Sequence, residues 1–198
     1  MHGNLAPNLK QQEADVVIAI GMRFSDRVTG NLKTYLKQAK IIHLDIDNAE
    51  INKNVHTDVA IVANCKDSLP LLTELVNKAS HKEWIESFKP LNEREKKRVI
   101  EKATHPEEGP LLMGEVVNAV AEATKGMSVT VTDVGQNQLF ATRYSKYNTP
   151  RSIITSGGLG TMGFGLPAAI GATFAEKERP VCVFMGDGGL QMSIQEFS

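Results

Sequence analysis

The sequence predicts an α/β protein made of two incomplete doubly wound parallel-sheet domains. Short runs of β-branched residues end in glycine or aspartate, most of these runs are apolar throughout, and stretches of helical character lie between them. Continuous apolar runs are typical of strands buried on both faces, as in a parallel sheet. Alternation of such strands with helices indicates an α/β fold.

The expected elements follow in order along the chain. Strands are expected at residues 15–21, 40–47, 58–65, 128–135, 152–157 and 179–186. Helices are expected at residues 32–38, 67–78, 111–124 and 163–178. Each half of the chain supplies about three strands, whereas a doubly wound domain usually has about six. We therefore expect two half-domains and a chain that is an internal piece of a longer protein.

A charged segment, residues 81–108, separates the two halves. Half of its residues are charged, with equal numbers of each sign, and Trp84, Ile85 and Phe88 form one apolar stripe. This pattern favours a solvated connecting helix, which ends at His105-Pro106 because proline cannot continue it.

Composition excludes several classes of protein. The 198 residues include 22 Lys+Arg and 23 Asp+Glu, for a net charge of −1, so no basic surface for nucleic acid is expected. The longest apolar run, Val16–Ile20, is far shorter than the ~20 residues that span a bilayer. Two distant cysteines, Cys65 and Cys182, form neither a disulfide framework nor a metal site, which favours a reducing, cytoplasmic setting.

The sharpest motif is Gly186-Asp187-Gly188-Gly189, directly after an expected strand. The motif places a carboxylate at the carboxyl edge of a sheet, where ligands of open α/β folds bind. A lone carboxylate there suits Mg²⁺, which binds one or two carboxylates together with phosphate oxygens. A glycine turn without a ligand is the alternative.

A glycine-rich stretch at residues 156–165 contains the pattern GxGxxG, from Gly158 to Gly163. A dinucleotide site is one interpretation. The acidic residue expected ~20 residues further on would be Glu176 or Glu178, at a helix end rather than a strand end, which weakens that interpretation. A flexible turn without a ligand is the other alternative.

Further polar groups follow other expected strands. Amides at Gln136, Asn137 and Gln138 follow Thr132-Asp133-Val134-Gly135 and either hold phosphate oxygens or cap a helix. In the first half, Arg23 and Arg27 either grip a pyrophosphate or pair with Asp26. Asp45 and Asp47 end a strand, as acids that hold a ribose or adenine group often do. His43, His56 and His81 share no ligand spacing and are interpreted as structural or surface residues.

Taken together, these motifs resemble those of the thiamine-diphosphate-dependent enzymes, and among them the large catalytic subunits of acetolactate synthases. Four stretches carry the resemblance: GMRFSDRVTG at 21–30, KIIHLDIDNAEI at 40–51, SGGLGTMGFGLPAAIGA at 156–172 and VFMGDGGLQMSIQE at 183–196. The RF-x-DRVTG element is the most specific of them, because glycine turns and GDG are widespread in related enzymes.

The resemblance implies a domain organisation. Residues 1–80 would be the C-terminal half of a central FAD-binding domain, residues 81–108 a charged helical linker, and residues 109–198 the N-terminal half of the domain that binds the diphosphate and Mg²⁺ of thiamine diphosphate. The acidic residue that activates the thiamine would lie outside this chain, so the chain holds no expected catalytic residue and is expected to be inactive alone.

The resemblance also implies cofactor-binding residues. For thiamine diphosphate these are Gln136, Asn137, Gly160, Thr161, Met162, Asp187, Gly188 and Gly189, with Asp187 as the Mg²⁺ ligand. For FAD they are His2, Gly21, Met22, Arg23, Phe24, Ser25, Asp45, Ile46, Asn64 and Cys65. The family often has His at Asn137, Asp at Ser25, Ser at Gly189 and Gly-Asp at Ala63-Asn64, so this chain departs from it at those positions.

The implied activity is that of a transferase. Such an enzyme decarboxylates pyruvate on thiamine diphosphate and transfers the hydroxyethyl unit to a second 2-keto acid, such as pyruvate or 2-ketobutyrate, in the first common step of branched-chain amino acid biosynthesis. FAD would be structural. The implied partners are further copies of the chain in a homo-oligomer and a small regulatory subunit. The alternatives are another thiamine-diphosphate enzyme, such as a pyruvate oxidase or glyoxylate carboligase, and a non-catalytic nucleotide- or diphosphate-binding module.

Overall fold

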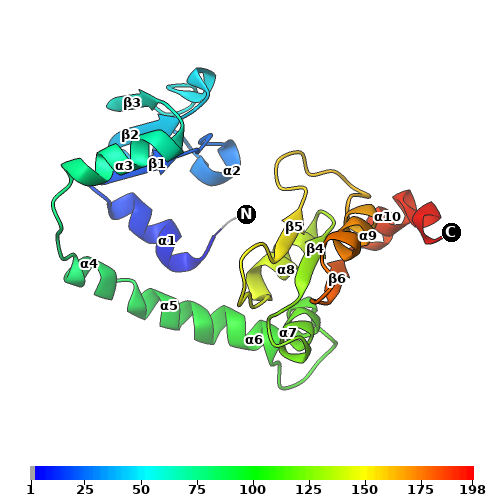
Figure 1. The fold of residues 1–198 in the computed structure, drawn as a ribbon. Coiled ribbons are helices and arrows are strands. Elements are labelled where there is room, and N and C mark those ends of the chain that lie inside the picture. The colour runs from blue at the N-terminus through cyan, green and yellow to red at the C-terminus, as the bar shows by residue number, and fades with distance from the viewer. Residues whose placement is uncertain (1–2) are drawn as a thin grey trace. The chain divides into compact units, whose positions relative to one another are not determined.

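The computed structural model describes residues 3–198, which form two compact units, with the chain passing from the first to the second between Glu95 and Lys96 (Figure 1). Each unit holds one three-stranded parallel sheet. The α/β fold class and the parallel sheets are therefore confirmed. The boundary between the units falls inside the charged segment 81–108, and the assignment of each unit to half of a cofactor domain stays a prediction.

The sheet of the first unit consists of β1 (Val16–Ile20), β2 (Lys40–Asp45) and β3 (Val59–Val62), in the order β1-β2-β3. Each of these strands lies within an expected one. The helices are α1 (Leu5–Lys10), η1 (Gln11–Glu13), α2 (Asp26–Thr29), η2 (Asn48–Glu50), α3 (Cys65–Leu75), α4 (Lys82–Glu86) and α5 (Lys89–Glu95). The backbone N–H of Leu5 donates to Oε2 of Glu95 at 2.8 Å and so joins α1 to α5.

The core of the first unit lies between the sheet and the connection from β1 to β2. Ala19 and Ile41 from the strands pack against Phe24, Tyr35 and Leu36 from this connection. The expected helix at 32–38 is wrong, because these residues form turns. Leu36 has φ +49°, outside the range of a right-handed helix, and its N–H donates to Oε1 of Gln12 at 3.2 Å.

The expectation that the strands are buried on both faces is wrong for β1. Val16, Ile18 and Ile20 are each nearly half exposed in this chain, and all three lie on one face because side chains alternate along a strand. Val59 of β3 is exposed on the same face, in register with Ile42 and Ile18. One side of this sheet therefore presents apolar side chains to solvent.

The sheet of the second unit consists of β4 (Val129–Thr132), β5 (Ile153–Thr155) and β6 (Val181–Phe184), in the order β5-β4-β6 (Figure 1). All three strands lie within expected ones. The helices are η3 (Lys96–Ile100), α6 (Glu101–Thr104), α7 (Met113–Ala123), α8 (Gln136–Tyr144), α9 (Gly165–Ala175), α10 (Asp187–Met192) and η4 (Ile194–Phe197). Helix α6 ends just before His105-Pro106, as the sequence predicts.

The central strand β4 is buried along its whole length. Val129 and Val131 pack against Ala169 and Ala172 of α9. The other face of β4 carries Thr130 and Thr132, which are also buried. A second cluster joins α7 to α8. The expected burial on both faces is confirmed for β4. Because this strand is packed on both faces, the residues that follow it at the carboxyl edge of the sheet are held in place.

Among residues 3–198, every helix is too short or too polar to cross a lipid bilayer.

Candidate functional site

The expected thiamine diphosphate residues gather at the carboxyl edge of the second sheet. Asn137 lies in the first turn of α8, just beyond β4, and the Gly186–Gly189 turn follows β6. A Cβ placed on Gly186 would lie 3.5 Å from Nδ2 of Asn137, and one placed on Gly188 would lie 3.4 Å from Cε of Met162. Three motifs that are far apart in the sequence therefore meet at one place.

Asp187 is the first residue of α10 and is exposed. Its side chain has no hydrogen-bond or ionic partner within the described part of the chain. The carboxylate is therefore available to a cation. It is also isolated, because no group of three or more potential metal-ligating side chains occurs in residues 3–198. One exposed carboxylate fits Mg²⁺, which completes its shell with water and phosphate oxygens.

The amide of Asn137 is buried behind the turn, with the residue 7% exposed. Its Nδ2 donates to the carbonyl of Val134 at 3.1 Å, while its Oδ1 is buried without a partner. A buried acceptor without a partner is costly, so this oxygen is suited to a bound donor such as a metal-bound water. Gln136, the first residue of α8, is exposed and lies at the same helix end.

The loop between β5 and α9 presents apolar side chains beside this turn. Gly160 has φ +63°, and its N–H donates to the carbonyl of Ser156 at 2.9 Å. The N–H of Thr161 donates to Oγ of the same serine at 3.0 Å, so the loop is held at its base. Met162 is 49% exposed. An exposed thioether next to Gly188 can contact an aromatic ring.

The structure adds one residue, Asp133, to the candidate site, and the sequence motifs assign it no role. Asp133 follows β4 directly, is 1% exposed, and faces Gly189: a Cβ on that glycine would lie 2.7 Å from Oδ1 of Asp133. Gly189 is itself buried. The sequence signal was an aspartate directly after a strand of β-branched residues, where a buried carboxylate needs hydrogen-bond partners.

The expected FAD residues lie along the carboxyl edge of the first sheet. Gly21 follows β1, and its N–H donates to the carbonyl of Leu44 at 2.8 Å. Asp45 ends β2, is buried, and accepts from the N–H of Asp47 at 2.9 Å. Asn64 follows β3 and caps α3 by accepting from the N–H of Lys66. The three strand ends thus bring three of the expected residues to one edge.

The remaining expected FAD residues differ widely in exposure. Phe24 is buried in the core, where its ring meets those of Tyr35 and His43 edge to face. Met22 packs against the same core, whereas Arg23 and Ile46 are exposed. Ser25 and Cys65 are half-buried. His2 lies outside the described residues.

His43 is fully buried, with Nε2 3.8 Å from Oδ2 of Asp45 and with neither ring nitrogen hydrogen-bonded. His56 and His81 are exposed. All three are structural or surface residues.

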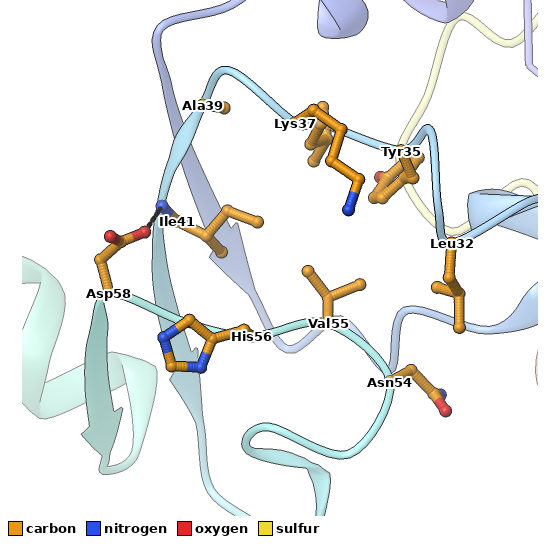
Figure 2. A pocket seen from close by; sticks show the side chains of 10 residues that line it. Leu32, Tyr35, Lys37, Ala39, Ile41, Asn54, Val55, His56 and Asp58 are labelled. Atoms are coloured by element: carbon orange, nitrogen blue, oxygen red, sulfur yellow. Dashed lines mark hydrogen bonds between the residues drawn. The ribbon is translucent and has the colours of Figure 1, made fainter.

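A separate hollow of about 370 Å³ lies at the amino end of the first sheet (Figure 2). Ile41 and Asp58 form one wall, where Oδ2 of Asp58 accepts from the N–H of Ile41 at 2.7 Å. Lys37 and His56 are exposed at its border. None of the expected cofactor residues lines this hollow.

Comparison with known families now gives the class of the protein. Residues 1–72 match the description "Thiamine pyrophosphate enzyme, central domain", and residues 133–198 match "Thiamine pyrophosphate enzyme, C-terminal TPP binding domain". The second match begins at Asp133 and includes the whole assembly around Asp187. The chain belongs to the thiamine pyrophosphate enzymes.

Within that family the chain is similar to acetolactate synthase large subunits. It is 44% identical over 198 residues to acetolactate synthase isozyme 1 large subunit of Escherichia coli, and 41% identical over 199 residues to the acetolactate synthase large subunit of Lactococcus lactis. It is 45% identical over 207 residues to a probable acetolactate synthase large subunit of Methanocaldococcus jannaschii. In each case the whole chain aligns, with 34% of the relative's length. The chain thus spans about a third of the length of the curated relatives it matches.

Proposed function

We propose that this chain supplies part of an acetolactate synthase large subunit, a transferase that depends on thiamine diphosphate. The observation that supports this most directly is the assembly of Asp187, Asn137 and Met162 at the carboxyl edge of the second sheet. These residues come from three separate motifs, and their positions suit a diphosphate with its metal ion.

The proposed roles follow from the geometry. Asp187 would hold Mg²⁺, because its carboxylate is exposed and unpaired within the described residues. The glycines after it, Gly188 and Gly189, leave the backbone N–H groups open to phosphate oxygens. Gln136 and Asn137 would contact the diphosphate or water bound to the metal. When bound, thiamine diphosphate supplies the electron sink for decarboxylation of a 2-keto acid.

The loop after β5 would hold the other end of the cofactor. Backbone groups of Gly160, Thr161 and Met162 would contact the aminopyrimidine, and the side chain of Met162 would support the bent form of the cofactor. These residues orient the reactive part of the cofactor and keep water from one side of it.

The first unit would contribute to an FAD site that has a structural role. Gly21, Asp45 and Asn64 share one edge of the first sheet, with Arg23 exposed nearby in sequence. A buried strand-end carboxylate suits a ribose hydroxyl, and an arginine suits a pyrophosphate. The units would then correspond to the C-terminal half of the central FAD-binding domain and the N-terminal half of the diphosphate domain.

The substrates and partners are proposed on the same basis. Pyruvate would be the donor, and pyruvate or 2-ketobutyrate the acceptor. The relatives are named large subunits, which supports a small partner subunit, and we propose a homo-oligomer as well. Cys65 and Cys182 are both free thiols, which supports a cytoplasmic location.

A segment exchange tests this function. The aligned segment of the Escherichia coli isozyme 1 large subunit is replaced by this chain, and acetolactate formation from pyruvate is assayed with thiamine diphosphate, Mg²⁺ and FAD. We expect the exchanged protein to form acetolactate, and the same protein with Asp187→Ala to lose at least ~10²-fold in rate. The chain alone is expected to give no turnover above the blank. A folded exchange protein that binds the cofactors and forms no acetolactate contradicts the proposal.

A further inference from the structure

The buried carboxylate of Asp133 lies where the end of β4 meets β6, α9 and the Gly186–Gly189 turn. Asp133 is the first residue after β4 and is 1% exposed. Its backbone N–H donates to the carbonyl of Phe184 at the end of β6 at 2.9 Å. Asp187 stands three residues after Phe184, so this bond fixes where the Gly186–Gly189 turn begins.

The side chain of Asp133 makes two further bonds. Oδ2 accepts from the N–H of Gly165, the first residue of α9, at 2.9 Å, and Oδ1 accepts from the N–H of Val134 at 2.8 Å. A negative charge at the first turn of an 11-residue helix is favoured by the partial positive charge of the helix end. Both oxygens are thus bound to backbone groups, which explains how a charge is tolerated at this depth.

These bonds reach the two groups that the diphosphate site needs. Val134, whose N–H is held by Asp133, accepts through its carbonyl oxygen from Nδ2 of Asn137 at 3.1 Å, and Oδ1 of Asn137 stays buried and unpartnered. On the other side, the carboxylate of Asp133 occupies the space beside Gly189, where a Cβ would approach Oδ1 to 2.7 Å and Cγ to 2.8 Å. Gly165 is also close, since a Cβ there would lie 3.0 Å from the N and 3.2 Å from Oδ2 of Asp133.

We propose that Asp133 is a positioning residue that sets the Gly186–Gly189 turn and the amide of Asn137 for the diphosphate and its metal ion. It does not touch the cofactor itself, because it is enclosed by Gly165, Gly189 and Val134. Its effect is transmitted through their backbone. This inference rests on the proposed function, because it assigns a supporting residue to that same site.

The test compares Asp133→Asn with the intact chain. The asparagine side chain keeps the size of the aspartate but places an NH₂ group where one backbone N–H must be accepted, so one bond is replaced by a repulsive contact. We expect the affinity for thiamine diphosphate with Mg²⁺, measured by calorimetry, to fall by about tenfold or more. Amide resonances of Gly165 and Gly188 should shift, while the far-ultraviolet circular dichroism stays unchanged. Asp15→Asn is the matched control, because within residues 3–198 its exposed carboxylate accepts only from the next residue, Val16, at 2.9 Å.

A second variant covers the case in which Asp133→Asn does not fold. Gly189→Ala keeps the aspartate at position 133, but the added methyl group would displace its carboxylate. This variant should therefore weaken the binding of thiamine diphosphate. In the double variant with Asp133→Ala, the methyl group added at position 189 no longer meets a carboxylate. Gly189→Ala should then lower the affinity for thiamine diphosphate by a smaller factor than it does in the chain that keeps Asp133.

The outcomes separate this inference from the proposed function. If the intact chain shows no Mg²⁺-dependent binding of thiamine diphosphate, the proposed function fails and the positioning role fails with it. If the intact chain binds and Asp133→Asn binds equally well, only the positioning role is overturned. Additive effects of the Gly189→Ala and Asp133→Ala changes also overturn it.

Discussion

The two sheets have the same number of parallel strands but are covered differently. In the second unit, β4 is buried along its whole length, with α9 packed on the face that carries Val131. In the first unit, β1 exposes Val16, Ile18 and Ile20 to solvent. Both sheets have a central strand between two neighbours. The central strand β4 of the second sheet is buried on both faces, whereas the edge strand β1 of the first sheet exposes one apolar face.

This difference extends to the candidate sites. At the edge of the second sheet, Asp133, Asn137 and the Gly186–Gly189 turn are tied together by buried hydrogen bonds and close backbone contacts. At the edge of the first sheet, Gly21 bonds to Leu44 of the next strand, and the side chains of Asp45 and Asn64 accept only from N–H groups two residues further on, within the described residues. Packing on both faces of the second sheet therefore fixes the side chains at its carboxyl edge. The first sheet brings its described candidate residues to one edge without such contacts between them.

The largest expected effect compares one valine of the covered sheet with one isoleucine of the uncovered sheet. Val131→Ala removes two fully buried methyl groups from β4, so it should lower the free energy of unfolding by about 2 kcal/mol. Ile18→Ala removes exposed atoms from β1 and should cost less than ~1 kcal/mol. Urea denaturation of both variants measures the difference, and equal losses would contradict the contrast between the sheets.

A smaller effect is expected at Arg179, which ties the start of β6 to the segment before β5. Its guanidinium donates to Glu176 at 2.7 Å, to Thr149 at 2.8 Å and to Ser152 at 3.0 Å. Arg179→Met leaves the buried Ser152 with fewer partners and should cost about 1–2 kcal/mol. Lys89→Met is the control, because its ion pair with Glu86 is exposed and should contribute about 0.5 kcal/mol or less.

The exposed face of β1 is also expected to cause self-association. Apolar side chains on a strand at the edge of a sheet favour pairing with other chains. Ile18→Lys should therefore lower the average mass seen by light scattering, because it places a charge in that face. Leu111→Lys changes an exposed leucine outside the strands and should have no such effect. A monodisperse monomer of the unchanged chain would rule out this prediction.

The smallest expected effect is the pH dependence of the stabilisation by Arg179. The hydrogen bond from Arg179 lowers the pKa of Glu176, with a further contribution from the N–H of Glu178. A lowered folded pKa means that the stabilisation is present above the ordinary pKa of glutamate and is lost as pH falls through the folded value. The difference in Tm between the intact chain and Arg179→Met should therefore shrink from about pH 6 to about pH 3. A difference that grows on acidification would reverse the sign and contradict the assignment.

The sequence predicted the sheets better than the helices. All six strands were expected, because β-branched runs ending in glycine or aspartate are a strong local signal. Residues 32–38 have the spacing of a helix but form turns, since Gln12, distant in sequence, binds the N–H of Leu36. Helix α8 is not among the expected helices, because it has no clear apolar stripe, although a helix cap at its three amides was one interpretation.

The site was predictable in its motifs and unpredictable in its contacts. Asp187 was expected as an available strand-end carboxylate, and it is exposed. The close approach of Gly189 to Asp133 depends on how β4, β6 and α9 pack, which no local pattern encodes. The burial of Phe24 has the same origin, since the residue follows a strand like a ligand group but turns into the core.

Calorimetric titration of the intact chain with thiamine diphosphate, with and without Mg²⁺, tests the role of Asp187 most directly. We predict binding that requires Mg²⁺ and that Asp187→Ala weakens by at least about tenfold, while the control variant Asp15→Asn binds like the intact chain. No heat at millimolar cofactor, or equal binding by Asp187→Ala, would show that this carboxylate does not hold the metal ion.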